Sequence, residues 1–156
     1  MNDSDSYDRQ DRADDYDRDR AVETNPAERG KWISGLVALL GLWLVAEAYL
    51  LDPIAGHFWS DIIVGVALIA LGGYNFYRRA NERIGSIGVG VFVALLGLWL
   101  VMTPFVLGST GEPGAGVEFD IEFWNDVIIG LLVFLLGAYS AYEARETEAV
   151  TPAART

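Results

Sequence analysis

The acidic residues that lie in otherwise apolar sequence are the first candidates for chemistry. Glu47 stands in the apolar run Trp32–Leu51, about four residues, or ~6 Å of helix, from its end. If that run crosses a bilayer, an ionised carboxylate there is unfavourable, by roughly 2.5–3.5 kcal/mol for a charge at a helix centre. Such a residue is a candidate for ion or proton binding. The alternative is an acid that reaches the interface or bonds to another helix, and the sequence leaves both interpretations open.

Two further acids, Asp61 and Asp126, stand near the start of two other apolar runs and follow Ser60 and Asn125. Serine and asparagine are good N-caps, and an acid in the first turn suits the helix dipole. The pattern therefore favours helix capping. The alternative is a pair of carboxylates that binds a cation at the outer mouth of a bundle.

A polar position also occurs where a repeated sequence places the counterpart of Glu47. VALLGLWLV occurs at residues 37–45 and again at 93–101, an offset of 56, so Thr103 corresponds to Glu47. Pro104 follows it and removes the helix hydrogen bond to the carbonyl of Leu100. If the two copies are neighbours, Glu47, Thr103 and that carbonyl would form one polar intramembrane spot.

Most catalytic and metal chemistry is excluded by residue counts. There is no cysteine and only one histidine, His57, so thiolate sites, His-pair metal sites and most His-based catalytic sets are ruled out. No nucleotide-binding loop or haem-ligand pair is present. The net charge of −11 disfavours nucleic-acid binding. We expect neither catalysis nor a cofactor, and no small-molecule substrate can be identified.

Four long apolar runs must position these residues. They are Trp32–Leu51, Phe58–Tyr77, Ile84–Leu107 and Phe123–Tyr142, each about 20 residues long. At ~1.5 Å per residue each spans the roughly 30 Å hydrocarbon layer. A soluble bundle would need a polar stripe on each helix, and runs such as VIIGLLVFLLGAY have none. The sequence predicts an all-α bundle of four transmembrane helices in contact with the lipid bilayer.

Basic residues predict the orientation of this bundle. Every basic residue near a predicted span falls on one side, and the connections 52–57 and 108–122 contain neither lysine nor arginine. The basic residues on that side are Arg29, Lys31, Arg78, Arg79, Arg83 and Arg145. The positive-inside rule then places both termini in the cytoplasm of a multi-pass protein of the cell membrane.

The internal repeat extends beyond the nine-residue identity. FWSDIIVG at residues 58–65 matches FWNDVIIG at 123–130 with an offset of 65, so the second hairpin loop is nine residues longer. The repeat therefore predicts two helical hairpins, residues 31–80 and 81–144. Each copy has an even number of spans, so the copies enter from the same side and are related by a pseudo-two-fold axis along the membrane normal.

Small residues recur seven apart on every predicted helix, close to two turns and thus on one face. Small faces let helices approach closely in lipid, so we expect helix packing here. Trp43 and Trp99 could stack on a ligand, but filling space beside facing glycines is favoured. The small residues are Ser34 and Gly41, Gly65 and Gly72, Gly90 and Gly97, and Gly130 and Gly137.

The segments outside the hairpins are polar. Residues 1–30 hold ten acids and five arginines, which predicts a disordered acidic tail on the cytoplasmic side, solvated or, alternatively, a docking segment for a partner. Residues 145–156 form a second cytoplasmic tail. Acid excess with a single lysine among eleven basic residues is typical of a halophilic archaeon.

Residues 32–142 resemble the SPW-repeat membrane proteins of bacteria and archaea. The resemblance rests on a GLWL helix followed by a Trp-x-Asp-apolar-apolar-x-Gly helix, while Glu47-Ala48-Tyr49 and Thr103-Pro104-Phe105 replace the Ser-Pro-Trp triplet. The resemblance implies no activity. Because no catalytic set is present and close-packing faces are abundant, we expect a non-enzymatic scaffold or accessory subunit that could form a homo-oligomer or bind another membrane subunit. The alternative is an oligomeric cation or proton transporter or channel component.

Overall fold

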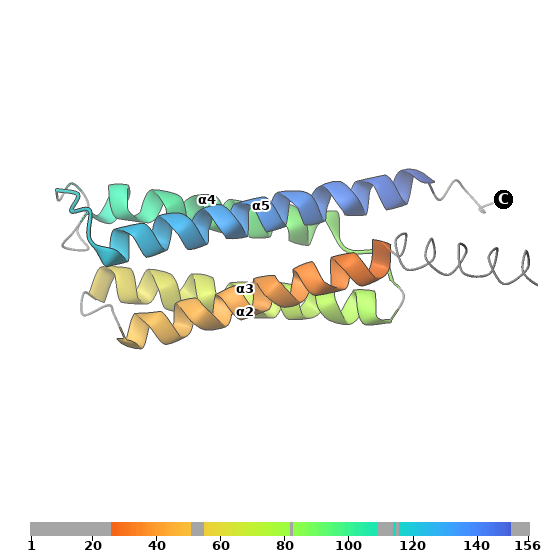
Figure 1. Cartoon of the computed structure of the whole chain (residues 1–156), viewed down its shortest axis with the longest axis horizontal. Coiled ribbons are helices and arrows are strands. Elements are labelled where there is room, and N and C mark those ends of the chain that lie inside the picture. Colours follow the sequence, from red (N-terminus) through yellow and green to blue (C-terminus); the bar gives the residue numbers. More distant parts are fainter. Residues whose placement is uncertain (1–25, 51–54, 82, 109–113, 115, 151–156) are drawn as a thin grey trace, which may run out of the picture.

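The computed structural model describes residues 26–50, 55–81, 83–108, 114 and 116–150. In these residues the chain is all-α and forms a bundle of two helical hairpins (Figure 1). The first hairpin contains α2 (Pro26–Leu50) and α3 (Ala55–Ala80), and the second contains α4 (Ile87–Leu107) and α5 (Ile121–Val150). The predicted fold class, four membrane-length helices in two hairpin repeats, is confirmed.

Glycines allow the two helices of each hairpin to touch backbone to backbone. A Cβ added at Gly41 would lie 2.6 Å from the carbonyl oxygen of Gly65, and one at Gly97 would lie 2.6 Å from that of Gly130. Contacts this short exclude any side chain. About two turns further along α3 and α5, Gly72 meets Ala38 and Gly137 meets Ala94 in the same way. The glycine pairs therefore lie inside each hairpin, at equivalent places in both repeats.

The hairpins pack on each other with α2 beside α5 and α3 beside α4. Helices α2 and α4 therefore lie across the diagonal of the bundle, as do α3 and α5. This arrangement is the one that a pseudo-two-fold axis along the bundle produces. The centre is filled by one residue from each helix with no exposed surface: Leu44, Leu68, Leu100 and Val133.

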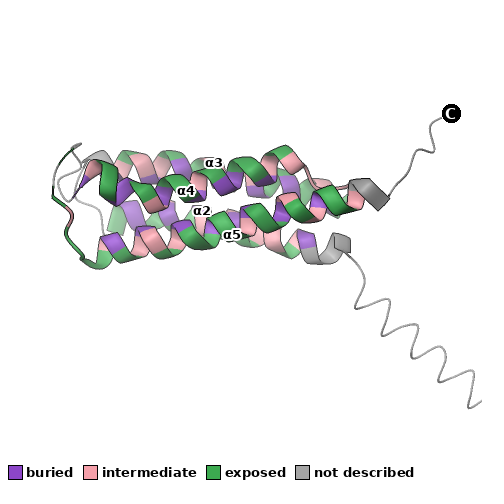
Figure 2. Ribbon diagram, turned by 90° about the horizontal axis from the view of Figure 1, so that it is seen from above, coloured by how far each residue is buried: buried purple, intermediate pink, exposed green. Residues whose placement is uncertain are grey.

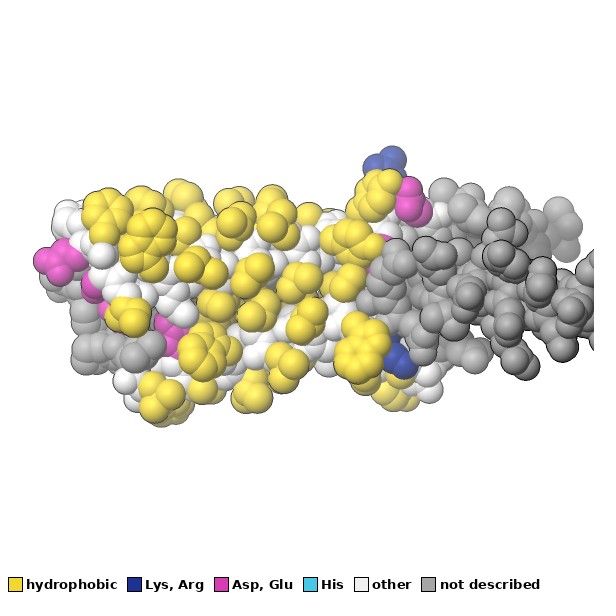
Figure 3. Space-filling view, in the orientation of Figure 1, with side chains coloured by type: hydrophobic (Ala, Val, Ile, Leu, Met, Phe, Trp, Pro, Cys, Tyr) yellow, Lys and Arg dark blue, Asp and Glu magenta, His cyan; other side chains and the backbone are white. Residues whose placement is uncertain are grey.

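The outer surface of the bundle is apolar over the length of a membrane. Each helix holds a stretch long and apolar enough to cross a bilayer: Gly30–Leu50, His57–Ala80, Ile87–Leu107 and Ile121–Thr147. Exposed residues alternate with buried ones on every helix (Figure 2). In Figure 3, hydrophobic side chains cover the middle of the molecule, and charged side chains gather towards its two ends.

The two ends differ in charge. We call the end that holds Glu47, Asp61, Glu118, Asp120 and Asp126 the acidic end. The opposite end, where α2 begins and α5 finishes, holds Lys31, Arg78, Arg79, Arg83 and Arg145, and we call it the arginine end.

Helix α2 begins at Pro26 and α5 continues to Val150, so both extend into segments predicted as tails. Proline is well suited to the first helical position, because its missing N–H would have no partner there. The Ala-Arg-Glu-Thr-Glu-Ala sequence after Glu143 favours helix. Helix α2 therefore begins within the segment 1–30 that was predicted as a disordered tail, and residues 1–25 of that segment lie outside the described part of the chain.

Candidate functional site

Asp61 and Asp126 do not lie in the first turns of their helices. Helix α3 begins at Ala55 and α5 at Ile121, so both acids lie five or six residues inside a helix. The capping prediction is therefore wrong. Asp120 has that role in α5, because its carboxylate accepts the backbone N–H of Phe123 at 2.9 Å. Apolar and aromatic residues before the Ser-Asp and Asn-Asp pairs extend both helices and bring the acids into the bundle, where they are 2% and 0% exposed.

Glu47 is buried in the same way and joins the two hairpins. Its side chain is 1% exposed, and its carboxylate accepts a hydrogen bond from the Nδ2 of Asn125 on α5. The Oδ1 of Asn125 in turn accepts the indole N–H of Trp43 at 3.4 Å. A carboxylate, an amide and an indole thus form one chain of hydrogen bonds between α2 and α5.

The second repeat makes the counterpart of the indole contact. The N–H of Trp99 on α4 donates to the Oγ of Ser60 on α3 at 3.2 Å. Trp43 corresponds to Trp99 and Ser60 to Asn125 in the repeat, so the two contacts are related by the pseudo-two-fold axis. Both indoles are about half exposed and do not fill space beside glycines. The reason is that each lies two residues, about 200° around its helix, from Gly41 or Gly97. These glycines lie at the seam, the line of contact between the two helices of a hairpin.

His57 connects α3 to the second hairpin at the acidic end. Its Nε2 lies 2.7 Å from the carbonyl oxygen of Gly108, and because a carbonyl only accepts, this nitrogen carries the proton. Its Nδ1 lies 3.9 Å from Oδ2 of Asp126. Gly108 ends α4 with φ at 64°, a left-handed conformation that favours glycine, and so turns its carbonyl away from the helix.

A small cavity joins this pair to the surface. It has a volume of about 10 Å³, room for about one water molecule, and is lined by His57 and Asp126 together with Glu118, Asp120 and Glu122. Glu118 and Asp120 are exposed. Among the described residues, no group of three or more histidine or acidic side chains has the geometry to hold a metal ion.

The polar spot predicted from Glu47, Thr103 and the carbonyl of Leu100 rested on α2 and α4 being neighbours, and they are not. The Thr103 hydroxyl instead donates to the carbonyl of Trp99 in its own helix, at 3.0 Å. Pro104 is accommodated within α4, which continues to Leu107. The repeat predicts which residues are equivalent but not which are adjacent, and a pseudo-two-fold axis places equivalent helices on a diagonal.

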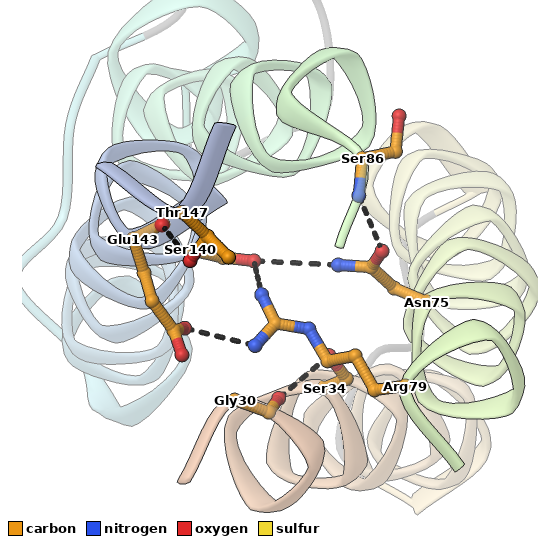
Figure 4. Close-up of polar contacts among 8 residues, drawn as sticks. All are labelled: Gly30, Ser34, Asn75, Arg79, Ser86, Ser140, Glu143 and Thr147. Atoms are coloured by element: carbon orange, nitrogen blue, oxygen red, sulfur yellow. Dashed lines mark hydrogen bonds and ion pairs between the residues drawn. The ribbon is translucent and has the colours of Figure 1, made fainter. Parts of the chain in front are cut away.

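A second polar cluster lies at the arginine end (Figure 4). Arg79 on α3 is 5% exposed, and its guanidinium bonds to two residues of α5, Glu143 at 2.9 Å and the Ser140 hydroxyl at 3.3 Å. It lies directly against Gly30 of α2, where an added Cβ would be only 1.1 Å from its Nη1. One side chain of α3 thus contacts both α2 and α5.

Asn75 extends this cluster to the connection between the hairpins. Its amide donates to the Oγ of Ser140 at 3.3 Å and accepts the backbone N–H of Ser86 at 2.9 Å. Ser86 is also the N-cap of α4 and accepts the N–H of Val89. The start of α4 is therefore attached to α3.

Sequence reasoning did not single out His57, Asn75, Arg79 or Ser140 as structural contacts. A usable signal was present for two of them, because Asn75 and Ser140 are equivalent in the repeat, at the offset of 65, and are polar in both copies. Nothing of that kind marks Arg79, whose counterpart is Ala144.

Taken together, four apolar spans in two equivalent hairpins, with polar clusters at both ends, define a multi-pass membrane protein built from an internal repeat. A family model described as the SPW repeat domain matches residues 31–140 and again residues 88–154. The chain belongs to the SPW repeat family. No curated protein and no solved structure matches it.

Proposed function

We propose that the protein is a non-enzymatic scaffold or accessory subunit of a membrane. The observation that carries this proposal is the filled centre of the bundle, where Leu44, Leu68, Leu100 and Val133 have no exposed surface. This layer separates the acidic end from the arginine end. The polar side chains on either side of it bind hairpin to hairpin, which is what a rigid structural element requires.

We further propose that the arginine end faces the cytoplasm of the cell, from the one-sided distribution of basic residues. The acid-rich composition supports a halophilic archaeon as the source. The orientation can be tested with single cysteines, because the chain has none of its own. Asn81 and Glu118 are exposed at the arginine and acidic ends.

A membrane-impermeant maleimide should label Glu118→Cys in intact cells and Asn81→Cys only after lysis. The reason is that the reagent reaches only the outer face of a sealed membrane. Labelling is measured as a mass shift on a gel, with the cysteine-free wild type as control. Labelling of Asn81→Cys but not Glu118→Cys in intact cells would show the opposite orientation.

A second function, transport of protons or cations by an oligomer, is favoured by one observation. Glu47, Asp61, Asp126 and His57 are all at least nine-tenths buried at the acidic end, and a water-sized cavity joins two of them to exposed carboxylates. Buried acids in membrane spans commonly mark ion or proton pathways.

A flux measurement distinguishes the scaffold from a proton transporter. Proteoliposomes that contain a pH-sensitive dye and sustain a potassium diffusion potential should acidify no faster with the wild type than without protein. The scaffold proposal predicts the same result for Glu47→Gln and for Glu118→Gln, an exposed control acid at the same end. Acidification by the wild type that Glu47→Gln abolishes and Glu118→Gln leaves intact would establish transport instead.

A further inference from the structure

The outer face of the first hairpin contains a groove with a volume of about 360 Å³. Its floor contains small residues from both helices, Gly35 and Ala38 of α2 and Gly73 of α3, and Leu42, Ile69 and Phe76 are among its walls. Every residue that lines it is apolar or glycine, and the groove lies within the membrane-length stretch of the bundle.

The glycines in this groove have no packing reason within the protein. A Cβ at Gly73 would meet nothing within 4 Å, and one at Gly35 would make only ordinary contact with the ring of Phe76, at 3.7 Å. Gly41, Gly65 and Gly72, by contrast, touch the backbone of the facing helix. Glycine weakens a helix relative to alanine, so Gly35 and Gly73 lower helix stability without a close contact inside the chain that requires them.

The second hairpin lacks these features. The repeat places Val91 at the position of Gly35, Phe134 at that of Ile69 and Ala138 at that of Gly73. All three of these side chains are larger than their counterparts in the first hairpin. The residues of the groove are therefore not repeated in the second hairpin, whose equivalent face provides a matched control surface.

The groove has the length of one lipid chain, and a basic residue lies near one end of it. It runs from near the arginine end to Leu42 and Ile69, near the middle of the bundle. From Lys31, which lies one turn before Gly35 on the same face of α2, to Leu42 is about 16 Å of helix, close to half of the roughly 30 Å hydrocarbon layer. The groove thus occupies one leaflet, with the only lysine of the chain at its headgroup level.

We propose that this groove holds one hydrocarbon chain of an anionic phospholipid whose phosphate contacts Lys31. A lysine at the headgroup level attracts an anionic headgroup through charge. The exposed aromatic rings of Trp32 and Tyr77 lie at the same end, where amphipathic rings prefer to sit. A second copy of the chain is the rival occupant, and the experiment separates the two.

The full chain, purified in mild detergent, should retain one molecule of dioleoylphosphatidylglycerol by native mass spectrometry, and less dioleoylphosphatidylcholine. Gly73→Leu fills the groove and should weaken retention of phosphatidylglycerol roughly tenfold. Ala138→Leu, the equivalent change on the second hairpin, should leave retention unchanged. Lys31→Gln, a change at the bundle end that leaves the groove intact, should remove the preference for phosphatidylglycerol over phosphatidylcholine.

Equal retention of the two lipids by the wild type would overturn the role of Lys31. Retention by Gly73→Leu equal to that of Ala138→Leu would overturn the groove as the site. A wild-type dimer that Gly73→Leu converts to a monomer, with lipid retention unchanged, would assign the groove to a second copy. None of these outcomes depends on whether the protein is a scaffold or a transporter.

Discussion

Replacing Gly97 by leucine should lower the free energy of unfolding by about 3 kcal/mol or more, at the upper end of the range for overpacking. A Cβ at this position would lie 2.3 Å from the backbone nitrogen of Phe134, so no rotamer change can relieve the clash. Helices α4 and α5 would have to separate along the seam that joins them. Thermal unfolding in detergent, followed by circular dichroism, measures the change.

Gly88→Leu on the same helix is the matched control. A Cβ there would approach only the Oγ of Ser86, at 3.8 Å, and the residue is exposed. We expect this variant to unfold within about 1 kcal/mol of the wild type, the effect of helix propensity alone. If both variants unfolded at the same temperature, close approach at Gly97 would not be what holds the second hairpin together.

Replacing Arg79 by methionine should lower the free energy of unfolding by about 3 kcal/mol, the low end of the range for breaking a buried ion pair. The change leaves the carboxylate of Glu143 largely buried, at 13% exposed, without its guanidinium partner. It also removes the contacts of Arg79 with Ser140 and Gly30. The same thermal measurement applies.

The double variant Arg79→Met with Glu143→Gln tests whether the orphaned charge causes this loss. It should recover more than half of the lost stability, because a neutral amide is far easier to bury than a carboxylate. A double variant no more stable than Arg79→Met would mean that the stabilising effect of Arg79 comes from its packing against Gly30 and not from the ion pair. The comparison of the single with the double variant thus separates the effect of the charge from that of the side-chain shape.

The two polar clusters have a common structural effect, although their chemistry differs. At the acidic end Glu47, Asn125 and Trp43 join α2 to α5, and at the arginine end Arg79 joins α3 to α5. In lipid, apolar contact between hairpins gains little over contact with acyl chains, so hydrogen bonds and close packing must supply the specificity. Clusters at both ends hold the hairpins in one register.

The sequence predicted the spans, the repeat and the seam glycines because each depends on local properties. A span follows from the summed transfer energies of about twenty neighbouring residues, and the packing face of a glycine pair follows from its seven-residue spacing. Helix ends were less accurate, since Ser60 and Asn125 are good caps in isolation but lie within longer helices.

Only the tertiary structure shows which polar residues contact one another. Glu47 and Asn125 are 78 positions apart, and Arg79 and Glu143 are 64 apart. Their meeting depends on the rotation and register of helices packed across the pseudo-two-fold axis, which no local pattern contains. The sequence alone therefore determined that this chain crosses a membrane four times as two equivalent hairpins. Only the packed bundle decided that equivalent helices lie on diagonals, so that Glu47 contacts the second hairpin through α5 and not through the neighbourhood of Thr103 on α4.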